Sequence, residues 1–373
     1  TIVIMENKTT DSQSTNKGVR PANDKKRSKL DNAEKYWKIL FYFTVPFFIL
    51  IFYPVLAFHR KLDKEGISYG KFSDLWLAGF AACLWHFIKS NWEYNVWQKI
   101  LPYVEDKHQD MERIHRAKRI SKWLFDVLHY SFFACFGFIA FYPILPTLLF
   151  GEQPCWDCFK GYPQPTSAHL PWVKEYYLIQ LGCILQKMVD QLIKKRNDVK
   201  FWEYFLHHVL AFGLIFQSYV ANYDRIGIII LVTHDTTDVF LAFTRAQEGL
   251  KYKVPVFFPI FFIVTFVVWT YLRGIVYTTC ELIPTLHFLA SKQIVRESPY
   301  TVETAIPDAG LFLQVILLAI MNYYWIVALA QIFYKNIKGK AVAKIIFGSG
   351  TAYINNYDPK LLKVSASISA VKQ

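Results

Sequence analysis

Two short segments combine histidine and aspartate inside otherwise apolar stretches of the chain. The first ends in the pair His207-His208, and the second reads His234-Asp235-x-x-Asp238. An imidazole beside a carboxylate suits general-base or nucleophilic acyl transfer, because the carboxylate orients the ring and stabilises the imidazolium. Histidine and aspartate are also common ligands of zinc and iron. The residue chemistry favours acyl transfer and leaves a metal site as the alternative.

The helices that must carry these segments are predicted over residues 202–222 and 226–246. The connection between them is short, so they run antiparallel. His207 lies on the order of 9 Å from the start of its helix, and Asp238 lies roughly 12 Å from the end of the next. The two segments therefore share one layer of the bundle. A charged side chain at the centre of a membrane helix costs about 3 kcal/mol, so the set indicates function rather than packing.

Composition places these helices in a membrane. Of the 373 residues, 53% are hydrophobic and 18% are aromatic, and they occur in long blocks separated by short basic loops. The pattern predicts an all-α, polytopic transmembrane helix bundle of about eight spans, with seven as the alternative. The block at 73–91 is the weakest and also fits a re-entrant or interfacial helix. The predicted spans are 37–58, 73–91, 123–150, 173–193, 202–222, 226–246, 254–283 and 310–334.

The distribution of positive charge predicts the orientation. With eight spans, the basic segments before residue 37 and at 99–122, 194–200, 245–253 and 335–344 fall on one face, which we expect to be cytosolic. The basic loop at 59–71 is the exception. The net charge of +13 follows from this bias, so we expect no nucleic acid as a partner. Cys155 and Cys158 supply two of the four ligands that zinc needs, so free thiols or a local disulfide are expected there.

A longer pattern surrounds the histidine and aspartate segments. It closely resembles the longevity-assurance motif of ceramide synthases, the acyl-CoA-dependent sphingoid-base N-acyltransferases of the TLC-domain superfamily. The matching residues are His207-His208, Ser218-Tyr219, Asn222, Arg225-Ile226-Gly227, His234-Asp235, Asp238 and, upstream, Gly161-Tyr162-Pro163 and the stretch 173–180. The sequence departs from the usual pattern at Ala211, Thr233, Ala242 and Arg245. These departures leave the reacting groups intact.

The resemblance implies a multi-pass enzyme of the endoplasmic reticulum membrane that joins a fatty acyl group from acyl-CoA to the amino group of a sphingoid base. Acyl-CoA would be a co-substrate, with no separate cofactor and no metal, and a homo- or hetero-oligomer is possible. Composition and charge predict a disordered basic cytosolic tail at 1–36, N-terminal spans and a basic loop at 37–121, and a cytosolic tail at 336–373. The resemblance implies a six-helix catalytic TLC domain at 122–335. The implied catalytic residues are His207, His208, His234, Asp235 and Asp238.

Substrate contacts are expected at both ends of the two key helices. Lys194, Lys195, Arg196 and Arg245 flank the basic ends and are expected to hold the CoA phosphates, although ordinary loop charge also explains them. Asn222 and Arg225 lie at the opposite end, where capping or packing is an equal alternative to substrate binding. Two other functions stay open: a non-catalytic TLC-domain protein in lipid sensing or trafficking, and a metal-dependent membrane oxygenase.

Overall fold

The computed structural model describes residues 35–42, 46, 54–104, 110–145, 156–159, 162–163, 170–194, 196, 201–247, 250, 257–294 and 302–337. Within these ranges all regular structure is helical, apart from one isolated bridge between Val104 and Leu250. The predicted all-α class is therefore confirmed. Nearly all of the predicted tails at 1–36 and 336–373 lies outside the described residues, as do Lys195 and Cys155.

Long helices form the body of the molecule. They are α2 (Leu75–Ile100), α3 (Asp110–Ala140), α5 (Val173–Lys194), α6 (Phe201–Val220), α7 (Asp224–Ala246), α8 (Phe257–Trp269), the π-helical η5 (Thr270–Leu282), α9 (Ile283–Ile294) and α10 (Val302–Ile337). Short 3₁₀ turns occur at Phe72–Asp74, Leu101–Tyr103 and Trp156–Phe159. Residues 54–65 are also helical, and α8, η5 and α9 follow one another without a break.

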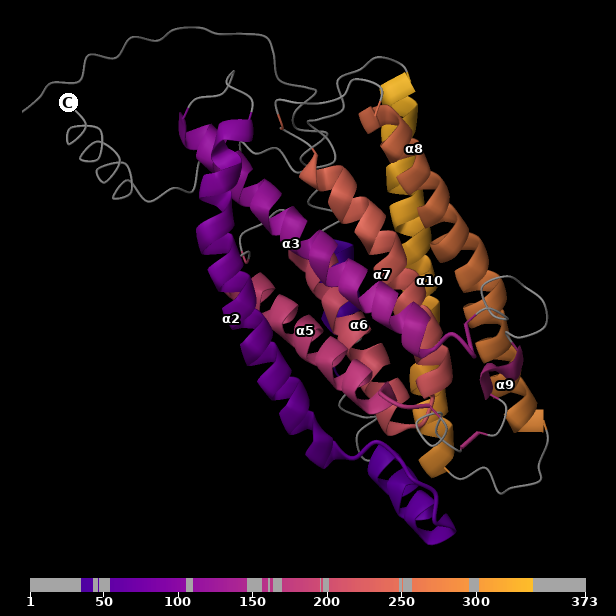
Figure 1. Cartoon of the computed structure of the whole chain (residues 1–373). Helices are drawn as coiled ribbons and strands as arrows, with labels where there is room; N and C mark the ends of the chain where they lie inside the picture. The colour runs from indigo at the N-terminus through magenta and orange to yellow at the C-terminus, as the bar shows by residue number, and fades with distance from the viewer. Residues whose placement is uncertain are drawn as a thin grey trace, which may run out of the picture.

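The helices pack side by side in a bundle (Figure 1). The most extensive contacts are those of α3 with α7 and of α2 with α5, while α6 packs against both α5 and α10. We call the end of the bundle that holds Lys194, Arg196 and Arg245 the basic end. The opposite end, which holds the connection 221–223 between α6 and α7, is the turn end. Helices α6 and α7 are antiparallel, as predicted.

Glycines lie at two close helix contacts. A Cβ atom added to Gly137 on α3 would lie 2.4 Å from Cγ2 of Val232 on α7, and one added to Gly182 on α5 would lie 2.4 Å from the backbone oxygen of Ala78 on α2. Small residues at helix interfaces let backbones approach closely, which increases packing contacts where the hydrophobic effect is weak. Gly137 therefore lets α3 approach α7, which carries His234 and the two aspartates, and Gly182 lets α5 approach α2.

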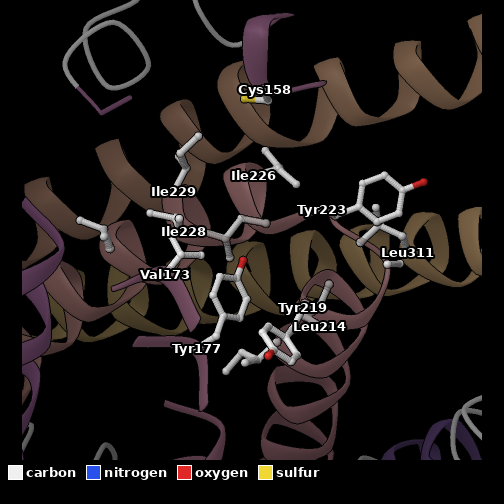
Figure 2. Close-up of a cluster of buried hydrophobic side chains, with 14 of the residues drawn as sticks. Cys158, Val173, Tyr177, Leu214, Tyr219, Tyr223, Ile226, Ile228, Ile229 and Leu311 are labelled. Atoms are coloured by element: carbon white, nitrogen blue, oxygen red, sulfur yellow. The ribbon is translucent and has the colours of Figure 1, made fainter. Parts of the chain in front are cut away.

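An apolar core closes the turn end (Figure 2). Tyr177 on α5 is fully buried and donates a hydrogen bond of 2.8 Å to the backbone oxygen of Asp224 at the start of α7. Asn222 adopts a left-handed backbone with φ of 59°, and its Nδ2 donates to the backbone oxygens of Ser68 at 2.9 Å and Pro163 at 2.8 Å. Because these bonds join three separate segments, the turn between α6 and α7 is held in one position.

Four described helical segments are long and apolar enough to cross a membrane: Asp110–Ala140, Asp224–Ala246, Ile260–Ser291 and Asp308–Tyr334. Helices α5 and α6, which the sequence also predicted as spans, are not among these four. Helix α2 presents large apolar side chains outward, among them Trp76, Phe80, Leu84 and Phe87. The described residues therefore support a multi-pass helical membrane protein and leave the predicted number of about eight spans as a proposal.

Two predicted helix boundaries are wrong. Residues 110–122, predicted as part of a basic loop, form the first turns of α3, where Arg116 and Glu112 pair at 2.9 Å. Charged residues with long side chains are good helix formers, so the helix extends beyond its apolar part. The helix predicted to end at 283 instead continues through α9 to Ile294. Pro284 lies at the junction between the π-helical η5 and α9.

Candidate active site

A single elongated cavity brings the predicted catalytic residues together. It lies among α3, α5, α6, α7, η5, α9 and α10 and encloses about 90 Å³ of space. All five predicted catalytic side chains line it: His207, His208, His234, Asp235 and Asp238. The shared layer that was inferred from helix lengths is therefore also a shared cavity wall in the folded protein.

The cavity has a polar part and an apolar part. Its lining along α7 runs from Ile226 to Asp238, which corresponds to about 18 Å of helix. The histidines, the aspartates and Arg273 lie toward the basic end. The wall toward the turn end is mostly apolar and includes Leu214, Ile215, Ile226, Ile230, Leu311, Val315 and Leu318. A ligand with a reactive polar head and a long hydrocarbon chain fits this distribution.

The structure defines the protonation pattern of the His234 ring. Its Nδ1 lies 2.8 Å from the backbone oxygen of Ile230, and a carbonyl oxygen only accepts hydrogen bonds. Nδ1 therefore carries the proton, and in the neutral ring Nε2 holds the free electron pair. Nε2 is buried, and the buried side chain of Asn322 lies close to the ring. His234 thus places a basic nitrogen beside the cavity.

The two adjacent histidines on α6 extend the polar wall. The ring centroids of His207 and His208 are 5.5 Å apart, and both side chains line the cavity. Nδ1 of His207 is buried and has no hydrogen-bond partner. Since α6 begins at Phe201, these rings lie about two helical turns from the basic end.

Each aspartate has its own partner from another helix. Oδ1 of Asp238 accepts a hydrogen bond from Nη2 of Arg273 at 2.6 Å, and Oδ2 of Asp235 accepts one from Nε2 of Gln180 at 2.5 Å. The sequence hypothesis was that the aspartates orient the catalytic imidazole. For His234 the structure instead provides a backbone carbonyl as the orienting group. Asp238 is thus paired with a cation and Asp235 with a neutral amide.

Arg273 is a site residue that sequence reasoning missed. It comes from η5, and its guanidinium also donates to Oγ1 of Thr237 at 2.6 Å and to the backbone oxygen of His234 at 3.1 Å. The guanidinium carbon lies 4.0 Å from the ring centroid of Trp269, one helical turn earlier. Arg273 fell inside a predicted span, so the rule that intramembrane charges mark functional sites would have found it. The same rule would have found Lys187 on α5.

Among the described residues, those predicted to bind substrate lie outside the cavity lining. Lys194 pairs with Asp190 at 3.0 Å, Arg196 is exposed, and the Arg245 guanidinium lies 4.6 Å from the ring centroid of Trp123. Arg225 is half-buried in the first turn of α7 at the turn end, near Asn222. In the part of the chain that the structure describes, no three His, Cys, Asp or Glu side chains converge as metal ligands would.

Comparisons with known proteins place the chain among its relatives. A family model described as TLC domain matches residues 119–331. The ceramide synthase hyl-2 of Caenorhabditis elegans is 24% identical over 289 residues, which cover 75% of this chain and 84% of that protein. The ceramide synthase LAG1 of Saccharomyces cerevisiae is 28% identical over 227 residues, or 59% of this chain and 52% of that protein.

A human relative matches over a shorter stretch. Ceramide synthase 5 of Homo sapiens is 31% identical over 139 residues, or 36% of this chain and 33% of that protein. The chain thus aligns with about half of the yeast relative and a third of the human one. Because the family model covers more than half of the chain and the similar proteins are named ceramide synthases or sphingosine N-acyltransferases, the protein belongs to the TLC-domain family of ceramide synthases.

Proposed function

We propose that this protein is a ceramide synthase, which transfers a fatty acyl group from acyl-CoA to the amino group of a sphingoid base. The observation that carries the proposal is the cavity, where three histidines and two aspartates share one wall with an apolar channel. Both substrates carry long hydrocarbon chains, so a site inside the bilayer suits them. The named relatives supply the reaction class.

The two parts of the cavity suggest how acyl-CoA is placed. The acyl chain would occupy the apolar wall toward the turn end, which brings the thioester beside His234 and the aspartates. The CoA phosphates would then stay at the basic end, within reach of Lys194, Arg196 and Arg245. Arginine and lysine are the usual binders of phosphate groups.

His234 serves as the general base in this scheme. A sphingoid amine is an ammonium ion near neutral pH and must lose a proton before it can attack the thioester. Nε2 of His234 takes that proton, while the charges of Asp235 and Asp238 attract the ammonium and stabilise the imidazolium. The amine then forms the C–N bond, the C–S bond breaks, and the sulfur leaves as thiolate. The nitrogen loses its second proton, so one proton goes to CoA and one to solvent.

A covalent route would begin differently, with His207, His208 or His234 attacking the thioester carbon to form an acyl-imidazole. Mixing the enzyme with acyl-CoA alone and searching for an acylated histidine by mass spectrometry separates the two routes.

We also propose that the protein is a multi-pass protein of the endoplasmic reticulum with about eight spans, and that six of these form the TLC core. The grouping of basic loops on one face supports this arrangement of spans, with the basic face in the cytosol.

The decisive test is expression of the chain in cells that lack ceramide synthase. Membranes would be assayed with a sphingoid base and a series of acyl-CoAs, and an N-acylated base is the expected product. His234→Ala should abolish it. His59→Ala is the matched control, since His59 is a buried histidine outside the cavity lining, with Nε2 2.6 Å from the backbone oxygen of Val220. Stable wild-type protein that yields no product with any chain length would contradict the proposal.

A further inference from the structure

Tyr130 and Lys187 form a hydrogen-bonded pair in the wall of the same cavity. Tyr130 lies on α3 and Lys187 on α5, and both side chains line the cavity. Nζ of Lys187 lies 3.0 Å from the hydroxyl oxygen of Tyr130 and 4.3 Å from the centroid of its ring. Neither residue belongs to the histidine and aspartate set, and the scheme above gives them no role.

The direction of the bonds leaves hydrogens available to a ligand. An ammonium group only donates, so the Tyr130 oxygen accepts from Lys187 and its own hydroxyl hydrogen is left for another acceptor. The second contact of Lys187 is with Nε2 of His129 at 3.2 Å, where the ring nitrogen must accept. Both partners of the ammonium are therefore neutral, and its positive charge polarises the phenol.

The pair lies at the polar part of the cavity. Lys187 is two helical turns from Gln180, which holds Asp235, and both residues project from the cavity face of α5. Lys187 is also close enough to His207 and Asp235 to interact with them electrostatically. Tyr130 is similarly close to Asp238.

Other strong donors in this wall are already used. The Arg273 guanidinium binds Asp238, Thr237 and the backbone of His234, and the Gln180 amide binds Asp235. The aspartates would repel negative charge. The Tyr130 hydroxyl and the remaining N–H of Lys187 are thus well suited to stabilise negative charge that develops on a ligand.

We propose that Tyr130 is a further catalytic residue, whose hydroxyl donates to the thioester carbonyl oxygen, and that Lys187 is the positioning residue that strengthens this donor. The inference rests on the proposed function. When a nucleophile bonds to the carbonyl carbon, the π electron pair moves to the oxygen, which becomes an oxyanion. The carbonyl then re-forms as the C–S bond breaks and its electron pair leaves on sulfur. Donors placed at such an oxygen stabilise the transition state more than the substrate.

The test is steady-state kinetics on purified wild-type and variant enzyme with acyl-CoA and a sphingoid base. Tyr130→Phe should lower kcat about 100-fold with little change in KM, the usual effect of losing one oxyanion donor. Lys187→Met should lower kcat similarly, whereas Lys187→Arg, which keeps the charge, should recover part of the loss. The kcat of the double variant should be little lower than that of the less active single variant, because the two residues act on one oxygen.

Tyr177→Phe is the matched control. It also removes a buried tyrosine hydroxyl, but this one binds a backbone oxygen at the turn end, so it should lower thermal stability and leave kcat near the wild-type value. Wild-type kcat in Tyr130→Phe, or an equal kcat loss in Tyr177→Phe, would overturn the inference. If Tyr130→Phe cannot be purified, unchanged kcat in Lys187→Met overturns it alone. An inactive wild-type enzyme would instead count against the proposed function.

Discussion

The ion pair between Arg273 and Asp238 is the most informative site to perturb. The Arg273 side chain is 3% exposed and that of Asp238 is 20% exposed, and their nearest N–O distance is 2.6 Å. Arg273→Met keeps an unbranched apolar side chain but removes the guanidinium. Asp238 then stays in the cavity wall without its cation, and Thr237 and the His234 backbone lose their donor.

The expected cost follows from this burial. Removing one partner of a buried ion pair usually costs about 3–5 kcal/mol, because the other charge is left uncompensated. Asp238 is partly accessible, so we expect the lower figure of about 3 kcal/mol. At about 2 °C per kcal/mol for a chain of this size, the midpoint of thermal unfolding should fall by roughly 6 °C. Asp238→Asn added to Arg273→Met should restore much of this loss.

The measurement is thermal denaturation in detergent, followed by size-exclusion chromatography of the tagged protein. Lys61→Met is the control, since Lys61 and Glu65 are 3.9 Å apart and nearly half exposed. That change should cost less than about 1 kcal/mol. If the midpoint changes of Arg273→Met and Asp238→Asn, each measured alone, simply add in the double variant, the two residues are not energetically coupled and the reasoning is wrong.

Three further predictions concern packing and local geometry. Gly137→Leu should strongly lower the unfolding midpoint and the yield of monodisperse protein, because even a Cβ would lie 2.4 Å from Val232. Asn222→Ala should lower the unfolding midpoint without changing KM for acyl-CoA. Asn222→Gly should lower the midpoint less, since glycine tolerates the left-handed backbone. A raised KM in both variants would favour a role of Asn222 in substrate binding instead. Gln180→Leu should cost about 1–3 kcal/mol by leaving Asp235 without its donor, seen as a lower midpoint; an unchanged midpoint would contradict this.

Much of the architecture follows from local sequence properties. Helical membrane segments require long apolar blocks, and these are visible in the chain at most of the positions where helices occur. Helix boundaries were less accurate, because hydropathy detects the apolar part of a helix and not a polar extension such as residues 110–122. The π-helical η5 and its continuation into α9 left no clear signal in the apolar pattern.

The grouping of His207 and His208 with His234, Asp235 and Asp238 could be inferred from sequence alone. The two helices are adjacent in the chain and joined by a short turn, so residue spacing converts directly into depth. By contrast, Arg273, Gln180, Tyr130 and Lys187 reach the cavity from helices outside this pair.

Only the tertiary structure brings these residues to the site, because the order and rotation of packed helices depend on side-chain contacts such as Gly137 against Val232, which spacing along one chain does not encode. The tautomer of His234 is likewise known only from the folded structure, since it depends on which carbonyl oxygen lies beside Nδ1. The sequence therefore determined the membrane helices and the layer of reactive groups, while the tertiary structure decided which partners surround each reactive group.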